Sequence, residues 1–193
     1  LTGCSNLSST ENNRSNLILD SQNLEVATLA GGCFWCIETP FENIEGVAKV
    51  ISGYTGGEKE NPTYAEVSSG KTKHVEAVQI HFDPKVISYS EILDLYWKQF
   101  DPTDAGGSFY DRGYQYTSAI FYHDEVQKKI AEISRNFLDN SGLFEDGIAT
   151  RIEPFNKFFE AEEYHQDFYI KQPTRYKNYR QGSGRDAFIA SVW

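Results

Sequence analysis

The chain has 193 residues and a net charge of −10 at pH 7, and 39% of its residues are hydrophobic and 15% aromatic. This composition predicts one domain with a tail, and it supplies enough apolar surface for a core, which excludes a wholly disordered chain. The acidic balance argues against a nucleic-acid partner, and no apolar run approaches the roughly 20 residues that span a bilayer.

The beginning of the chain differs in composition from the rest. Residues 5–23 contain five Ser and five Asn, a proportion that is typical of a flexible tether. We therefore expect residues 1–23 to form a tether and residues 24–193 to form the folded domain. The chain contains no Met, not even at position 1, so we also expect that its start has been processed or truncated.

Hydrophobic periodicity predicts the secondary structure of the folded part. Strand patterns occupy residues 25–30, 47–54, 75–82, 118–122 and 149–152. Helix patterns occupy residues 33–42, 88–100, 124–140 and 158–171. In the third helix one face carries Val126, Ile130, Ile133 and Phe137.

The order of these elements predicts an α+β fold. We expect a two-layer sandwich around a mixed or antiparallel sheet, with a ferredoxin-like βαβ core. Two long loops, over residues 55–73 and 101–116, interrupt the pattern and hold or adjoin several tyrosines. Long loops in compact domains are usually functional, so we expect a site between them.

A pair of cysteines follows the first strand, in the sequence Gly31-Gly32-Cys33-Phe34-Trp35-Cys36. The glycines allow a tight turn that places Cys33 at the start of a helix, where the helix dipole lowers a thiol pKa. Cys36 lies one helical turn further on, so the two thiols are able to form a disulfide. A reactive thiol beside a second thiol is what a sulfenic-acid cycle requires.

The cysteine pair has three other possible interpretations. Half of a zinc site would need two further ligands, and the four histidines are unpaired in sequence. A buried inert pair does not fit an exposed turn between strand and helix. A thioredoxin-type dithiol is the closest rival, but that motif usually has small or polar residues between its cysteines. Phe34 and Trp35 instead suggest a pocket for an apolar substrate group.

From about Leu24 to the C-terminus the chain resembles the peptide methionine sulfoxide reductase A family. The resemblance begins with Gly32-Cys33-Phe34-Trp35-Cys36, the signature of that family. Further matching blocks follow in the family's order: Gly53-Tyr54-Thr55-Gly56-Gly57, Asn61-Pro62-Thr63-Tyr64, Ser69-Gly70, His74-Val75-Glu76, Asp101-Pro102-Thr103, Asp111-Arg112-Gly113, Gln115-Tyr116 and Tyr164-His165-Gln166.

The resemblance implies a role for each site residue. It makes Cys33 the nucleophile that attacks the sulfoxide sulfur and Glu76 the carboxylic acid. A sulfoxide oxygen leaves poorly until it is protonated or strongly hydrogen-bonded, so a protonated carboxyl and two phenols suit the reaction. The other implied residues are Phe34 and Trp35 in the methyl pocket, Tyr64 and Tyr116 on the sulfoxide oxygen, and Asp111 near the backbone of the bound residue.

Some positions depart from the family or stay open. Val75 stands where the family usually has Ala, and Tyr114 where it often has Thr, which adds bulk near the site. A further tyrosine late in the chain contributes in some members, and either Tyr176 or Tyr179 could take that place. His165 is expected to be a hydrogen-bonded structural residue rather than a catalytic base.

The implied reaction is the reduction of the S epimer of methionine sulfoxide, free or in proteins. Cys33 would become a sulfenic acid, and Cys36 would resolve it to a disulfide, because the C-terminal region has no cysteine for this step. A thioredoxin-like dithiol would then reduce the disulfide. The resemblance implies no metal and no organic cofactor.

The first four residues, Leu1-Thr2-Gly3-Cys4, resemble the lipobox of bacterial lipoproteins. In such proteins the cysteine is lipidated, and the resemblance implies that Cys4 anchors the enzyme to a membrane outside the cytoplasm. The alternative is a cytoplasmic enzyme with a chance cysteine in its tail.

Two other function classes remain open at this point. A thioredoxin-like disulfide oxidoreductase would ignore sulfoxides. A noncatalytic surface lipoprotein would use its aromatic loops as an adhesive patch.

Overall fold

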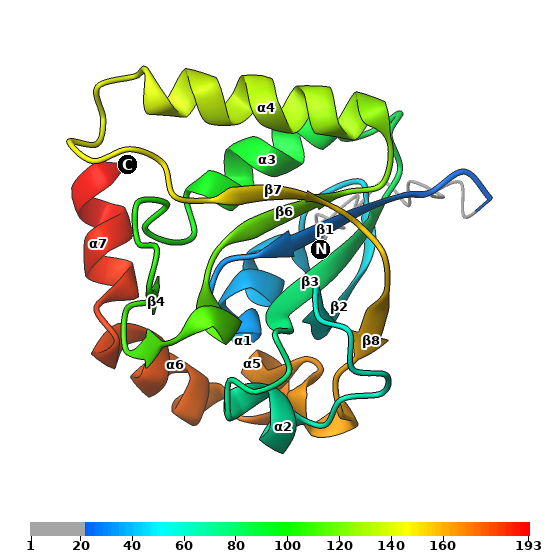
Figure 1. Ribbon diagram of the computed structural model, residues 1–193, viewed down its shortest axis with the longest axis vertical. Helices are drawn as coiled ribbons and strands as arrows, with labels where there is room; N and C mark the ends of the chain where they lie inside the picture. Colours follow the sequence, from blue (N-terminus) through cyan, green and yellow to red (C-terminus); the bar gives the residue numbers. More distant parts are fainter. Residues whose placement is uncertain (1–21) are drawn as a thin grey trace, which may run out of the picture.

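The computed structural model describes residues 22–193, so Cys4 and most of the expected tether lie outside the described residues. Figure 1 shows a central sheet with helices above it, below it and along one edge. None of the described helices is both long and apolar enough to cross a membrane.

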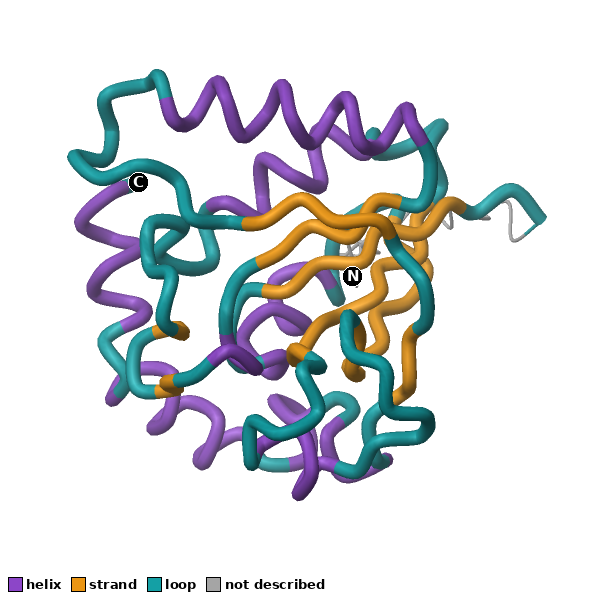
Figure 2. Tube along the Cα trace, viewed as in Figure 1, coloured by secondary structure: helices purple, strands orange, loops and turns teal. Residues whose placement is uncertain are grey.

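The main sheet has six strands in the order β7-β6-β1-β3-β2-β8. They comprise β1 (Glu25–Ala30), β2 (Val47–Thr55), β3 (Val75–Phe82), β6 (Ala119–Tyr122), β7 (Arg151–Pro154) and β8 (Phe158–Glu160). Every neighbouring pair is antiparallel except β6 and β7. The tube in Figure 2 shows these strands side by side. The sheet is therefore mixed, as expected.

The centre of this sheet has the split βαβ arrangement of a ferredoxin-like core. Strands β1 and β2 run parallel on either side of β3, and helix α1 (Phe34–Glu38) connects them. Strand β6 pairs with the other edge of β1, and helix α3 (Tyr89–Trp97) leads to it from β3. The expected α+β class and its βαβ core are confirmed.

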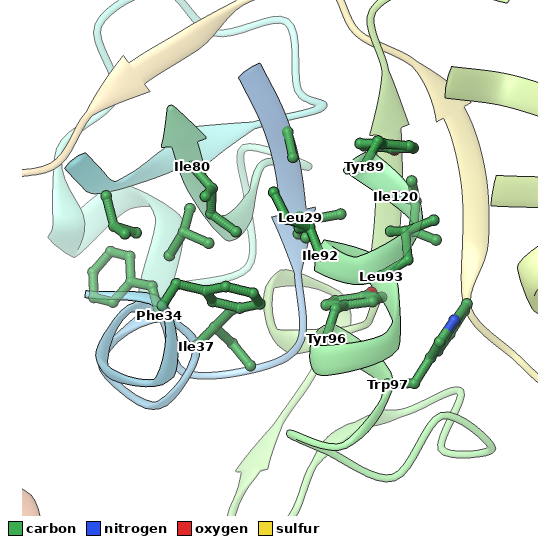
Figure 3. Close-up of a cluster of buried hydrophobic side chains, with 14 of the residues drawn as sticks. Leu29, Phe34, Ile37, Ile80, Tyr89, Ile92, Leu93, Tyr96, Trp97 and Ile120 are labelled. Atoms are coloured by element: carbon green, nitrogen blue, oxygen red, sulfur yellow. The ribbon is translucent and has the colours of Figure 1, made fainter. Parts of the chain in front are cut away.

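The larger core lies between the sheet and helices α1 and α3. Figure 3 shows Phe34 and Ile37 of α1 and Ile92 and Tyr96 of α3 packed against strand residues such as Leu29. All of these side chains are at most 1% exposed. The apolar stripe of each helix explains this packing, because burial of each large side chain contributes about 1.5–3 kcal/mol.

The long loop over residues 55–73 contains a helix that the sequence analysis left out, α2 (Tyr64–Ser68). Thr63 and Glu66 form a capping box, in which each side chain bonds the backbone N–H of the other residue. This Thr-x-x-Glu spacing was a usable signal. The loop over residues 101–116 likewise contains a two-stranded ribbon, β4 (Gly107–Ser108) with β5 (Asp111–Arg112), and a 3-10 helix, η2 (Tyr114–Tyr116).

The expected helix over residues 158–171 is wrong at its start. Residues Phe158–Glu160 form strand β8, which pairs with β2 through Phe159 opposite Tyr54. Short helical turns follow, η3 (Glu163–His165) and α5 (Phe168–Lys171). The free edge of β2 supplies a pairing partner that no local pattern reveals, so tertiary context overrides the helical periodicity.

Helix α4 (Glu125–Asp139) occurs where expected, but its apolar stripe is not its buried face. Val126, Ile133 and Phe137 are 60–79% exposed. The buried side chains on this helix are Gln127, Ala131 and Leu138. Gln127 is held inward because its side chain donates to the carbonyl of Val26 and accepts from the N–H of His123.

The chain ends in two helices that the sequence analysis did not predict, α6 (Pro173–Gly182) and α7 (Arg185–Val192). They run along the edge of the molecule beside β4 (Figure 1). Phe188 of α7 packs against Phe109 of the second loop with 5.7 Å between ring centroids. The C-terminal segment is thereby held against the loops that border the site.

Candidate active site

Cys33 lies at the turn from β1 into α1, in the N-cap position of the helix. Gly32 precedes it with φ +96°, a conformation that other residues rarely adopt. A Cβ atom at Gly32 would also lie 2.4 Å from the Cβ of Ser108. Glycine is therefore required here, and the tight turn presents Cys33 at the end of the strand.

The two thiols are buried and lie within hydrogen-bonding reach of each other. Burial, together with the hydrogen bond to Cys36, raises the pKa of the Cys33 thiol. The same hydrogen bond lowers the pKa of Cys36 to about 7 against the effect of burial, with help from the charges of Arg185 and Arg180. The expected lowering of the Cys33 pKa is thus wrong for the free site, because α1 has only five residues and desolvation outweighs its short dipole.

Glu76 reaches the start of α1 from the centre of the sheet. Alternation along β3 puts Glu76 on the same face as Val78 and Ile80, which is the face that α1 covers. Its Oε2 accepts a hydrogen bond from the N–H of Phe34 at 3.0 Å. Burial raises the pKa of Glu76 to about 8, so the carboxyl group is mostly protonated at neutral pH.

A cavity of about 210 Å³ joins these groups to the two long loops. Seven of the eight predicted site residues line it, and the eighth, Cys36, is fully buried. The lining residues are Cys33, Phe34, Trp35, Tyr64, Glu76, Asp111, Tyr116, Arg175 and Tyr179. A larger hollow of about 560 Å³, over residues 56–73, is lined by glycines, Ser, Thr, Lys and Glu, and its lining includes no cysteine.

An aromatic cluster forms the apolar wall of the cavity. Trp35 stacks on Phe168 with ring centroids 3.7 Å apart, and its indole N–H donates to Nδ1 of His165 at 3.2 Å. His165 also lies against the rings of Phe34 and Tyr64. Burial lowers the pKa of His165 to about 4, so it is neutral and orients Trp35. This is the hydrogen-bonded structural role that the sequence analysis expected.

Two phenols face Glu76 across the cavity. Tyr64 begins α2 and Tyr116 ends η2, so the two long loops converge here. Burial, and then the charges that Glu76 and Cys33 carry once they are deprotonated, raise the pKa of Tyr64 to about 12, and burial raises the pKa of Tyr116 as well. Both hydroxyls therefore keep their protons and are able to donate hydrogen bonds.

Tyr179, not Tyr176, is the late tyrosine at the site. Its hydroxyl donates to Oδ2 of Asp111, and its ring lies edge-on to Trp35. The hydroxyl of Tyr176 instead accepts from Arg180. Arg175, a second lining residue from α6, was missed because no helix was predicted there.

The two departures from the family lie outside the cavity. Val75 is fully buried, and alternation along β3 points it to the opposite face of the sheet from Glu76. The hydroxyl of Tyr114 accepts from Arg151, whose guanidinium lies 4.7 Å from the tyrosine ring. The added bulk expected from Tyr114 near the site is therefore absent.

Within the described part of the chain, one group of acids comes close enough to bind a metal ion, namely Glu38, Glu42 and Asp167. Glu38 already accepts hydrogen bonds from the Ser52 hydroxyl and the Asp167 N–H. Burial raises the pKa of Glu38 to about 7, which favours a neutral carboxyl over a cation ligand. These contacts instead tie α1 to β2 and to the segment that follows His165.

Comparison of sequences relates the chain to one family. The family described as Peptide methionine sulfoxide reductase matches residues 25–193. A Staphylococcus aureus protein named peptide methionine sulfoxide reductase MsrA 2 is 55% identical over 169 residues, which cover 88% of this chain and 96% of that protein. A Bacillus subtilis protein named peptide methionine sulfoxide reductase MsrA is 56% identical over 173 residues, which cover 90% of this chain and 98% of that protein.

Solved structures give the same relation. Mxr1 of Saccharomyces cerevisiae in its reduced form has a TM-score of 0.73 at 33% identity, covering 81% of this chain and 90% of that one. Methionine sulfoxide reductase A of Corynebacterium diphtheriae has a TM-score of 0.69 at 31% identity, and the match covers 78% of this chain and 76% of that chain. Mxr1 of Saccharomyces cerevisiae in complex with Trx2 has a TM-score of 0.52 at 25% identity, and the match covers 80% of this chain and 91% of that chain.

Proposed function

The chain belongs to the peptide methionine sulfoxide reductase family and reduces methionine sulfoxide, and we propose that Cys33, Cys36 and Glu76 carry the chemistry. The observation that carries this assignment is one cavity that holds a thiol, a protonated carboxyl group and two protonated phenols. A sulfoxide needs all three: a nucleophile for its sulfur, a proton for its oxygen, and donors that share the developing charge.

In the first step the Cys33 sulfur attacks the sulfoxide sulfur while Glu76 donates its proton to the oxygen. The oxygen passes to Cys33 as a sulfenic acid, and methionine is released. Phe34 and Trp35 hold the methyl group against an apolar wall, and Tyr64 and Tyr116 bond the oxygen. Cys36 then attacks the sulfenic sulfur, which forms a disulfide and releases water.

The disulfide is reduced by a thioredoxin-like dithiol through thiol–disulfide exchange. The complex of the related protein Mxr1 with Trx2 supports a thioredoxin as the partner. Turnover with separate epimers of methionine sulfoxide tests the substrate assignment. We expect turnover of the S epimer with dithiothreitol. Reduction of protein disulfides without any sulfoxide turnover would instead make the chain a thioredoxin-like oxidoreductase.

Replacing Cys36 with Ser is expected to separate the two steps. About one equivalent of methionine should still form per enzyme, because Cys33 is intact, but turnover with thioredoxin should fall by at least ~100-fold because no disulfide forms. The trapped sulfenic acid is detected by mass spectrometry after reaction with a dimedone-type probe. Normal cycling of this variant with thioredoxin would assign the resolving role to another thiol.

We also propose that lipidated Cys4 tethers the enzyme to a membrane outside the cytoplasm. The support is the Leu1-Thr2-Gly3-Cys4 sequence followed by the Ser- and Asn-rich segment. A flexible segment of nineteen residues would have a root-mean-square reach of roughly 25 Å, enough to hold the domain clear of the lipid headgroups. We expect a Cys4→Ala precursor to leave the membrane fraction while its catalytic rate is unchanged. An unmodified Cys4 in the mass spectrum of the native protein would refute this proposal.

A further inference from the structure

Arg185 is the largest side chain that is fully buried in the described structure, with 1% of its surface exposed. It begins helix α7, and its guanidinium contacts the Gly31-Gly32 turn that leads to Cys33. Nη1 donates to the carbonyls of Gln99 at 2.7 Å and Gly31 at 3.3 Å, and Nη2 donates to the Ser108 hydroxyl at 3.2 Å. The face of the Phe109 ring lies 4.9 Å from the guanidinium carbon.

These partners are all neutral. No carboxylate of residues 22–193 forms an ion pair with Arg185, and its Nε–H is buried without a hydrogen-bond partner. The other arginine near the cysteines, Arg180, differs in this respect, because its Nε pairs with Asp186 at 2.6 Å. A buried charge without a counter-ion is unfavourable, so a guanidinium in this position favours the anionic form of a titratable group beside it.

The cysteine pair is the group next to this charge. A Cβ atom on Gly32, the residue before Cys33, would lie 3.0 Å from Nη2 of Arg185. The pKa of Cys36 is lowered first by its hydrogen bond with Cys33 and then by the charge of Arg185. Asp111 is also near this charge, but burial raises the pKa of Asp111, and its carboxylate already accepts a hydrogen bond from Tyr179. Beyond its hydrogen bond with Cys33, a Cys36 thiolate is stabilised by the charges of Arg185 and Arg180, and of these two arginines only Arg185 has no carboxylate partner among residues 22–193.

We infer that Arg185 is a positioning residue that holds the Gly31-Gly32 turn and keeps Cys36 as a thiolate for the resolving step. This inference rests on the proposed function. In that step the Cys36 thiolate forms a bond to the Cys33 sulfur, the S–O bond of the sulfenic acid breaks, and hydroxide takes up a proton to leave as water. The Cys36 sulfur is oxidised and the Cys33 sulfur is reduced to the common level of the disulfide. A thiolate is required because a neutral thiol attacks poorly.

The test measures the charge state of Cys36 without any turnover. In a Cys4→Ala, Cys33→Ser background Cys36 is the only cysteine, and the 13Cβ chemical shift of labelled cysteine follows its titration. We expect Arg185→Met to move the midpoint upward by at least about one pH unit, which is a tenfold fall in the acid dissociation constant of the thiol. Arg185→Lys, which keeps the charge and loses the planar fork, should move it by less than half as much.

Arg135→Met is the matched control, since Arg135 also donates to a backbone carbonyl, that of Thr150, but lies on α4. It changes the net charge equally and should leave the midpoint in place. An unchanged midpoint in Arg185→Met, or an equal change in Arg135→Met, would overturn the inference. If Arg185→Met does not fold, Arg185→Lys decides, and a midpoint that moves by a full unit there refutes the charge role. Failure of the proposed function would appear separately, as an absence of methionine formation by the unmodified chain.

Discussion

Replacing Cys33 with Ser is expected to abolish methionine formation, to below about 1% of the native rate, with either dithiothreitol or thioredoxin as reductant. A serine hydroxyl at neutral pH is not a nucleophile toward a sulfoxide, and it is unable to take up the oxygen as a sulfenic acid. Cys33 is the only thiol that lines the cavity with Glu76 and the two phenols, within the described part of the chain. No other group there is able to replace it.

The assay is a single turnover with stoichiometric methionine sulfoxide, followed by quantification of methionine. Cys4→Ala is the matched control, because it removes a thiol outside the described domain and should keep the native rate. Methionine formation by the Cys33 variant at more than about 1% of that rate would mean that another group is the nucleophile.

Local sequence patterns were sufficient for the central strands. The expected limits of β1 and β3 agree with the structure at both ends. Turn residues end both patterns, Gly31-Gly32 after β1 and Asp83-Pro84 after β3. Strand β8 was not predictable in this way. Its three residues become a strand only because β2 has a free edge, and that edge exists only in the assembled sheet.

Helix α4 shows a different limit of sequence reasoning. Its periodicity correctly predicts a helix. The buried face, however, includes Gln127, a polar residue whose side chain donates a hydrogen bond to β1. A pattern based on hydrophobicity assigns such a residue to the solvent side. Polar side chains become core residues when the fold supplies partners for them, and those partners are distant in sequence.

At the site, the family resemblance predicted residues that their spacing in the sequence alone would not have placed in one cavity. Tyr64 and Tyr116 are 52 positions apart and meet because the two loops border the same end of the sheet. Tyr179 and Arg175 enter from α6, for which the sequence analysis had no helix. The pKa of Cys33 is raised by burial, and burial is a property of the packed structure that the local sequence does not encode.

Replacing Glu76 with Gln is expected to slow the reduction of the sulfoxide by a factor of about 10²–10⁴, the usual effect of losing a positioned proton donor. Gln has nearly the same shape, and its carbonyl is still able to accept the hydrogen bond from the Phe34 N–H. Substrate affinity should therefore change much less than the rate. The measurement is the single-turnover rate of methionine formation against substrate concentration, which separates the two effects.

The pH dependence of that rate identifies the proton donor. Burial raises the pKa of Glu76 to about 8, so its carboxyl carries a proton below this pH and loses it above. In the native chain, loss of the Glu76 proton lowers the single-turnover rate as the pH rises through about 8, and deprotonation of Cys33 acts in the opposite direction. In Glu76→Gln the group no longer titrates, so a fall that is due to Glu76 must disappear, while any rise due to the Cys33 thiol persists. Comparison of the two profiles isolates the carboxyl, and an equal single-turnover rate in the two proteins across this range would remove Glu76 from the mechanism.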